Sequence, residues 1–210
     1  MRPGCDFWTP EPVFLGQDVY AIGGGPSLRG FDFGRLRGRR VIACNAAGYS
    51  LPWADVLLFH DNSFFETNRP LIDGWPGLAV TASRAAKAAS DRLLRVELVE
   101  RPDFTVGQPV LKLGASSGHT AVSLAIAMGA RRVVLLGYDM RKVDGVTHWH
   151  DRYTVADDPY SGVFRDGWRG FNVAALAVGV EVLNATPGSA LDEFRRVNID
   201  DILRKPTCRP

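Results

Sequence analysis

The rest of the chain is organised around VYAIGGGPSL, Val19 to Leu28. Its apolar run stops abruptly at Gly23-Gly24-Gly25, and Pro26 and Ser27 follow. A buried strand looks like this when it ends in a loop that brings backbone amides close to a ligand. Glycines leave room for a phosphate or ribose and adopt positive φ without strain. Ser27 is placed to cap the next helical turn, whose free N–H groups favour anions. An ordinary tight turn is the alternative interpretation of this stretch alone.

Length and composition indicate one ordinary globular domain over residues 1–210. A single domain usually has roughly 100–200 residues. A chain of this size buries about 70% of its unfolded surface, so it needs no disulfides to fold. Hydrophobic residues make up 46% and charged residues 23% of the chain, which is typical of soluble proteins. The net charge of +2 gives no strong indication of a nucleic-acid partner.

The cysteines and the apolar runs indicate a cytoplasmic protein. Cys5, Cys44 and Cys208 lie far apart and form no CxxC pair, so neither a zinc site nor a disulfide framework is predicted. A reducing compartment fits this usage. The N-terminus has no apolar h-region, and no apolar run approaches the ~18 residues that span a bilayer. We therefore expect no membrane partner.

Apolar strands alternate with helical segments along the chain. The strongest helix, His119–Met128, is apolar on most faces and begins after Ser116-Ser117-Gly118. Pro70–Pro76 is predicted to be a turn, and Val96–Val99 an edge strand. The expected buried strands are Asp18–Ile22, Arg40–Cys44, Ala54–His60, Leu78–Thr81, Arg132–Leu136 and Glu181–Asn184. This alternation predicts an α/β fold with a doubly wound, mostly parallel, Rossmann-like sheet.

Small, polar or ionisable residues follow nearly every expected strand. Ligands of such sheets bind beyond the carboxyl ends of the strands, so this coincidence predicts a nucleotide-type site. The residues at these ends are Gly23 to Ser27, Asn45, His60 with Asp61, Gly137 with Asp139, and Asn184 to Ser189.

The glycine loop differs from the common nucleotide motifs. It lacks the GxGxxG pattern with an acidic residue about 20 positions later, and the chain has no GxxxxGK[ST]. The second strand ends at Asn45, whose amide could bind a base or ribose edge or simply form a turn. Ser116 and Ser117 offer hydroxyls and free amides to a ligand, with plain helix capping as the alternative.

The residues best suited to acid–base chemistry lie in THWHD, Thr147 to Asp151, within the polar segment Arg141–Gly167. His148 and His150, beside Asp151, are predicted to act as an acid–base or phosphate-contacting group, or else to be exposed loop residues. No third ligand is evident from the spacing, so no metal site is predicted. Asp61 and Asp139 could bind Mg²⁺ with phosphate oxygens, or cap turns. His119 is expected to be structural.

In combination, these motifs resemble the sialyltransferase-like and DUF115-type superfamily. It includes bacterial CMP-sialic-acid-dependent glycosyltransferases, archaeal 6-hydroxymethylpterin pyrophosphokinases and many bacteriophage proteins. The motifs that carry the resemblance are GGGPSL (Gly23 to Leu28), Cys44-Asn45, Ser116 to Gly118 with Ala125 to Met140, and NATPGS (Asn184 to Ser189).

The resemblance implies roles for individual residues. Gly24, Gly25, Ser27 and Asn45 would hold a CMP moiety, and Ser116 to Gly118 would contact the nucleotide or donor sugar. His148 or His150 would be the general base, with Tyr153 and Tyr160 near the leaving phosphate. If the chain were instead a pyrophosphokinase with ATP and Mg²⁺, Asp61 and Asp139 would be the metal ligands.

The leading hypothesis is a cytoplasmic transferase domain that uses a nucleotide-activated donor, most simply a glycosyltransferase with a CMP-sugar. Residues 1–17 would be an arm, 141–167 a lid over the donor, and 204–210 a tail. The alternatives are a Mg²⁺-dependent pyrophosphokinase and a non-catalytic nucleotide-binding module. The acceptor class is open, and a homo-oligomer is compatible with the sequence.

Overall fold

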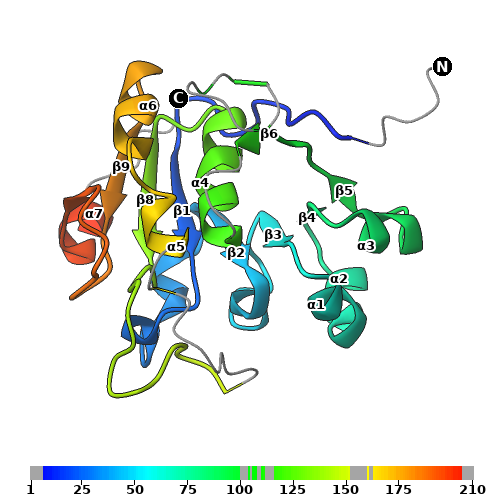
Figure 1. The fold of residues 1–210 in the computed structure, drawn as a ribbon, viewed down its shortest axis with the longest axis horizontal. Coiled ribbons are helices and arrows are strands. Elements are labelled where there is room, and N and C mark those ends of the chain that lie inside the picture. The colour runs from blue at the N-terminus through cyan, green and yellow to red at the C-terminus, as the bar shows by residue number, and fades with distance from the viewer. Residues whose placement is uncertain are drawn as a thin grey trace.

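The computed structural model describes residues 7–99, 104, 106–107, 110–111, 116–151, 160 and 163–204. Within them, eight parallel strands form one sheet in the order β10-β9-β8-β1-β2-β3-β4-β5 (Figure 1). The strands are β1 (Asp18–Ile22), β2 (Arg40–Cys44), β3 (Val56–Phe59), β4 (Leu78–Thr81), β5 (Leu94–Arg95), β8 (Arg132–Leu136), β9 (Glu181–Asn184) and β10 (Arg195–Arg196). The predicted α/β class and parallel sheet are confirmed.

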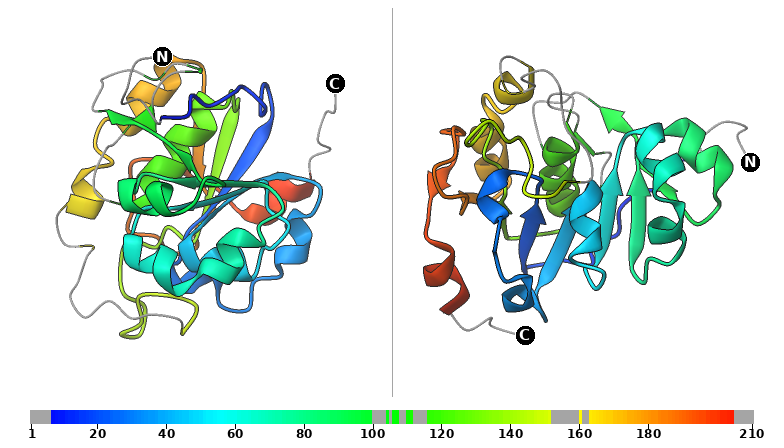
Figure 2. Two further views of the ribbon diagram at one scale, coloured as in Figure 1. Left: turned by 90° about the vertical axis from the view of Figure 1, so that its right-hand side faces the viewer. Right: turned by 90° about the horizontal axis from the view of Figure 1, so that it is seen from below.

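Helices cover both faces of this sheet. In Figures 1 and 2, α1, α2 and α3 gather toward β4 and β5, whereas α6 and α7 lie toward β9. The helices are α1 (Asn62–Thr67), α2 (Arg69–Asp73), α3 (Arg84–Ala89), α4 (Ser117–Ala127), α5 (Val163–Asp166), α6 (Phe171–Ala177) and α7 (Ile199–Arg204), with 3₁₀ turns η1 (Pro26–Leu28), η2 (Phe33–Leu36) and η3 (Asn45–Tyr49). None of the helices in the described ranges has the length and apolar character needed to cross a membrane.

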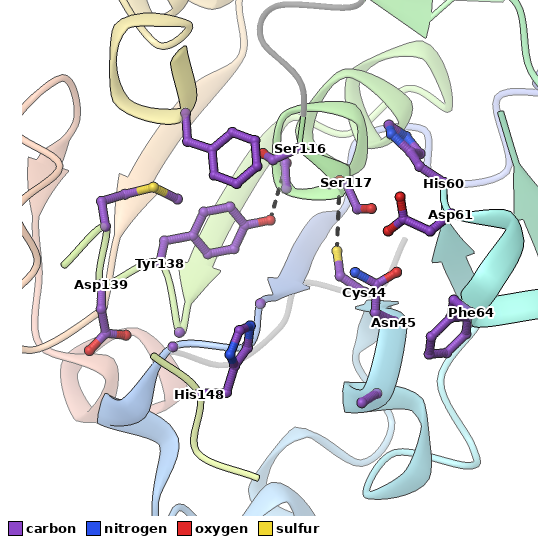
Figure 3. A pocket seen from close by; sticks show the side chains of 18 of the residues that line it. Cys44, Asn45, His60, Asp61, Phe64, Ser116, Ser117, Tyr138, Asp139 and His148 are labelled. Carbon is purple, nitrogen blue, oxygen red and sulfur yellow. Dashed lines mark hydrogen bonds between the residues drawn. The ribbon is translucent and has the colours of Figure 1, made fainter. Parts of the chain in front are cut away.

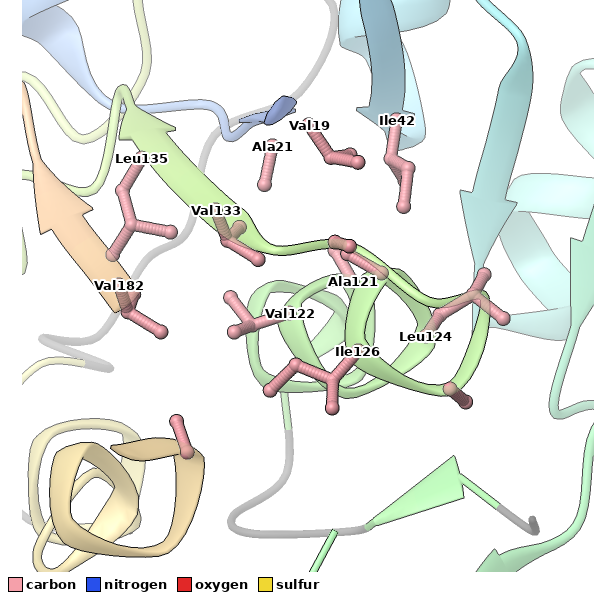
Figure 4. Packing of buried hydrophobic residues seen from close by; sticks show 14 of the residues in the cluster. Val19, Ala21, Ile42, Ala121, Val122, Leu124, Ile126, Val133, Leu135 and Val182 are labelled. Atoms are coloured by element: carbon pink, nitrogen blue, oxygen red, sulfur yellow. The ribbon is translucent and has the colours of Figure 1, made fainter. Parts of the chain in front are cut away.

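The central strands are buried on both sides, which explains their continuous apolar sequences. Because successive side chains of a strand point to opposite faces, Val19 and Ala21 of β1 pack on the face covered by α4. Tyr20 and Ile22 pack on the other face. Figure 4 shows the first of these interfaces, where side chains of β1, β2 and β8 meet α4. All of α4 from His119 to Ala127 is buried, so this helix fixes its own N-terminus at the end of the sheet.

Two expectations for single elements are wrong. Pro70–Pro76 is not a turn, because α2 begins at Arg69 and Pro70 occupies its first turn, where the missing N–H has no intrahelical partner to lose. Val96–Val99 is not the edge of the main sheet. Leu98–Val99 forms β6, which pairs with β7 (Val110–Leu111) in a separate two-stranded sheet.

We expect Leu124→Ala in α4 to lower the free energy of unfolding by about 2–5 kcal/mol, because it leaves a cavity under a fully buried side chain. Leu176→Ala in α6 is the matched control. Its side chain is 53% exposed, so the loss should stay within about 0.5 kcal/mol. Urea unfolding of both variants measures the difference, and equal losses would contradict this packing.

Candidate active site

A cavity of about 590 Å³ opens at the carboxyl ends of β1, β2, β3 and β8, beside the N-terminus of α4 (Figure 3). Ligand pockets commonly have this volume, and this position is the one expected for a parallel sheet. The residues that line it are Gly23, Gly24, Gly25, Cys44, Asn45, Ala46, His60, Asp61, Ser63, Phe64, Thr67, Asn68, Ser116, Ser117, Gly118, Gly137, Tyr138, Asp139, Met140, His148, Tyr160 and Phe164.

Most of the candidate residues chosen from the sequence come together at this cavity. The structure brings the three glycines, Asn45, Asp61, Ser116 to Gly118, Asp139 and His148 to its wall. It does not bring Pro26, Ser27 or His150 there. Tyr153 lies outside the described residues.

The glycine loop lines the cavity but is also hydrogen-bonded to the carboxyl end of β8. The N–H of Gly23 donates to the carbonyl of Leu136, and that of Gly25 to the carbonyl of Gly137, both at 2.8 Å. Two of the backbone N–H groups that were expected to face a ligand therefore already donate hydrogen bonds within the protein. The glycines instead permit close packing. A Cβ on Gly24 would lie 2.7 Å from Cδ2 of His148, and one on Gly25 only 1.9 Å from Oδ2 of Asp139.

Asp139 holds this loop in place. Its carboxylate accepts hydrogen bonds from the backbone N–H of Ser27 at 3.0 Å and from the Ser27 hydroxyl at 2.7 Å. Ser27 therefore does not cap η1 with its side chain, as the sequence suggested. Burial raises the pKa of Asp139, and the two bonds from Ser27 oppose that rise.

The pair of carboxylates considered for Mg²⁺ does not form a metal site. Both oxygens of Asp139 are engaged by Ser27, and in Figure 3 this carboxylate points away from Asp61. No group of three or more His, Cys, Asp or Glu side chains in the described ranges is arranged to hold a metal ion. Asp61 and Asp139 therefore do not converge as a pair of metal ligands.

Asn45 combines backbone strain with an unsatisfied side chain. It has a φ of +50°, which asparagine tolerates better than most residues but which is uncommon outside glycine. Its Oδ1 is buried and has no hydrogen-bond partner among the described residues. Strained, unsatisfied groups of this kind cluster at ligand sites, so Asn45 is a strong candidate for contact with a ligand.

The start of α4 presents neutral hydrogen-bond donors to the cavity. Ser116 is the N-cap residue, and its Oγ accepts from the N–H of His119 at 3.5 Å. The N–H groups of the first turn lack intrahelical partners and carry the positive end of the helix dipole. Among the described lining residues there is no lysine or arginine. An anion bound here would therefore depend on uncharged donors.

His148 is held against the glycine loop by its neighbours. The N–H of Trp149 donates to the carbonyl of Gly24 at 3.0 Å, and the Trp149 ring packs on Phe33. Thr147 Oγ1 lies 2.9 Å from Nδ1 of His148, while the hydroxyl of Tyr160 donates to the Thr147 carbonyl at 3.0 Å. Burial, and secondly the nearby His150, lowers the pKa of His148 to about 4. The ring is consequently neutral at physiological pH and able to accept a proton.

Cys44 and Tyr138 form an unreactive part of the wall. Burial raises the pKa of the Cys44 thiol to about 12, so the sulfur remains protonated and is no nucleophile. Burial likewise raises the pKa of Tyr138, whose hydroxyl donates to the Gly118 carbonyl at 3.2 Å. Tyr138 thus braces the first turn of α4.

The comparisons with known proteins support this fold without naming a family. No protein-family model matches the chain, and no curated protein matches its sequence significantly. The structure is similar to the MAf glycosyltransferase of Magnetospirillum magneticum AMB-1, with a TM-score of 0.69 and 13% identity over 96% of this chain. That match spans only 36% of the MAf chain.

A second similarity is to the sialyltransferase CstII of Campylobacter jejuni, solved with the substrate analogue CMP-3FNeuAc. The TM-score is 0.54 at 14% identity, and 86% of each chain is covered. Another structure of the same enzyme, with a trisaccharide acceptor and CMP, gives the same values. At these identities the likenesses show a shared α/β fold.

Several lining residues are not predicted as site residues from the sequence. His60 directly follows β3, where the sequence shows it only as part of a polar strand end. Tyr138 lies between Gly137 and Asp139, the two polar or small residues expected at the end of β8. Phe64, Thr67 and Asn68 line the cavity from α1 and its C-terminal end. From its sequence, Phe64 fits either a stacking surface for a base or sugar or the core, and the core is the expectation. Thr67 and Asn68 carry no signal, because neither α1 nor α2 is predicted.

We expect the Asp139–Ser27 contact to stabilise the loop measurably. In a double-mutant cycle of Asp139→Ala and Ser27→Ala, the coupling energy should be about 1–3 kcal/mol, as for hydrogen bonds to a charged group. Asp61→Ala is the control, because this aspartate also lies at the cavity wall, but its side chain is exposed and makes no capping hydrogen bond to α1. Its effect should stay within about 0.5 kcal/mol. Additive effects of the two loop variants in urea unfolding would contradict the contact.

Proposed function

We propose that this protein is a glycosyltransferase that uses a CMP-activated sugar as donor. The observation that carries the proposal is the cavity at the carboxyl end of the sheet, where Asn45, the start of α4 and a neutral histidine converge without a cationic side chain in the described wall. A CMP-sugar carries a single phosphodiester charge at its leaving group, so uncharged donors and a helix N-terminus can serve it. A nucleoside triphosphate would leave several charges uncompensated.

The structural neighbours support the same proposal. Two solved structures of CstII hold CMP or the CMP-3FNeuAc analogue, and MAf is also described as a glycosyltransferase. The fold of this chain therefore occurs among enzymes of this chemistry. The resemblance of GGGPSL and Cys44-Asn45 to the sialyltransferase motifs agrees with it.

In this proposal His148 is the general base. It removes the proton of an acceptor hydroxyl while that oxygen attacks the anomeric carbon of the donor. The bond from the sugar to the phosphate breaks, and CMP leaves with the electron pair. Tyr160 and Phe164, in the described parts of 141–167, line the cavity, which supports a role of that segment in excluding water from a bound donor.

Ligand specificity is testable by thermal shift. We expect CMP to raise the melting temperature more than AMP, or ATP with Mg²⁺, at equal excess. At 100 times the Kd, a ligand adds about 2.7 kcal/mol. A larger shift with Mg²⁺-ATP, abolished by EDTA, would favour a pyrophosphokinase instead. Binding of CMP without turnover of any CMP-sugar would favour a non-catalytic module.

Asn45→Gly separates a ligand contact from a turn-forming role. Glycine adopts the positive φ without strain, so stability should be unchanged or higher, whereas loss of the amide should weaken CMP binding about tenfold. Isothermal titration with CMP and urea unfolding provide the two measurements. Unchanged CMP affinity would indicate that Asn45 only forms the turn.

His148→Gln should lower kcat by about 10²–10⁴, the usual contribution of a general base. In the wild-type protein, kcat/KM should be lost only as the pH falls well below 6.5, toward the pKa of about 4, because protonation of His148 removes the base. His150→Gln, outside the cavity wall, should keep kcat within about tenfold and move the acidic limb to slightly higher pH. If the acidic limb of the pH profile of kcat/KM persisted unchanged in His148→Gln, His148 would be ruled out as the general base.

A further inference from the structure

His119 is a buried histidine that the proposed reaction does not use. Its side chain is fully buried, and its ring stacks on Trp168 with the ring centroids 4.0 Å apart. Burial, and secondly the neighbouring His60, lowers its pKa to about 3, so the ring is neutral. A neutral, tightly packed imidazole has one N–H donor and one nitrogen acceptor in fixed directions.

One ring nitrogen of His119 is directed at a residue of the cavity wall. Nδ1 lies 2.6 Å from Oγ of Ser116, which lines the cavity. The same Oγ also accepts the N–H of His119 at 3.5 Å, as the cap of α4. The other nitrogen, Nε2, is buried and has no hydrogen-bond partner within the described part of the chain.

The two tautomers of His119 would give Ser116 opposite properties. If Nε2 carries the proton, the Ser116 hydroxyl donates to Nδ1, and one lone pair remains for a ligand donor. A buried N–H is then left without an acceptor. If Nδ1 carries the proton, Oγ accepts from both Nδ1 and the backbone. Its own hydrogen is then directed elsewhere, and the buried Nε2 is an unsatisfied acceptor. Buried donors without partners are the rarer of the two defects.

We propose that His119 is a positioning residue that keeps the Ser116 hydroxyl as a hydrogen-bond donor toward an anionic oxygen of the donor substrate. The inference rests on the proposed function. It explains how the site would favour a donor substrate with an anionic oxygen at this position. Because the described wall holds no lysine or arginine, the direction of each neutral donor at the start of α4 matters more than it would beside a cation. The Ser116 hydroxyl lies at the positive end of the helix dipole.

The tautomer can be measured without any ligand. Two-bond ¹⁵N–¹H correlation spectra of the ¹⁵N-histidine-labelled protein distinguish an Nδ1–H from an Nε2–H imidazole. We expect the Nδ1–H tautomer for His119, assigned by the loss of its signals in His119→Phe. An Nε2–H tautomer would overturn the proposal, even if CMP binds as proposed.

The ligand test compares CMP with cytidine, which lacks the phosphate. His119→Phe keeps a flat ring against Trp168 but removes Nδ1. It should weaken CMP binding about tenfold and leave cytidine binding within about twofold. In a Ser116→Ala background the same change should have no further effect on CMP. Equal losses for CMP and cytidine, or an undiminished loss in that background, would show that His119 only supports the fold.

Ser123→Ala is the matched control. Its hydroxyl belongs to the same helix and donates to the carbonyl of His119 at 3.1 Å, but it does not line the cavity. The Ser123→Ala variant should bind CMP as tightly as the wild-type protein. A tenfold loss of CMP affinity in this variant would argue against a specific role for His119. If the wild-type protein binds no CMP, the proposed function fails, while the tautomer still decides the inference about His119.

Discussion

The candidate site depends on the contact between the carboxylate of Asp139 and Ser27. β1 and β8 are neighbours in the sheet, and they lead into η1 and into the segment that carries His148. The two hydrogen bonds from Ser27, at 3.0 and 2.7 Å, tie these segments together at the carboxyl edge. Gly25 is required because any Cβ there would collide with the same carboxylate. The glycine loop is thus a fixed wall against which His148 packs.

In the proposed function, this arrangement leaves anion binding to the start of α4 rather than to the glycine loop. The amides of Gly23, Gly25 and Ser27 are engaged by β8 and Asp139, whereas the first turn of α4 faces the cavity. Burial of α4 against the sheet fixes the position of that turn. The same packing that stabilises the fold therefore holds the neutral donors of the site in place.

Burial also determines which titratable groups can react. It keeps His148 and His119 neutral and Cys44 protonated at physiological pH. The three residues differ in what they face. His148 lies at the wall of the cavity, where the proposed function has it exchange a proton with a substrate. Among the described side chains of the cavity wall, His119 is hydrogen-bonded to the Ser116 hydroxyl, so the proposed role of His119 is exerted through that residue.

The sequence alone determined the α/β class, the parallel sheet and the edge at which the cavity lies, because continuous apolar runs require burial on both faces and their polar ends must meet. The polar strand ends placed Asn45 there, and the resemblance to the sialyltransferase-like proteins implied the same site for the Ser116–Gly118 turn and for His148 or His150. The tertiary structure alone decided that Asp139 holds Ser27 instead of a metal, that Phe64 reaches the cavity from α1, and that His119 faces Ser116. Each of these contacts joins residues that only the folded chain brings together. The contact between Asp139 and Ser27, for example, spans 112 positions of the chain. No local pattern of residues specifies such a pairing.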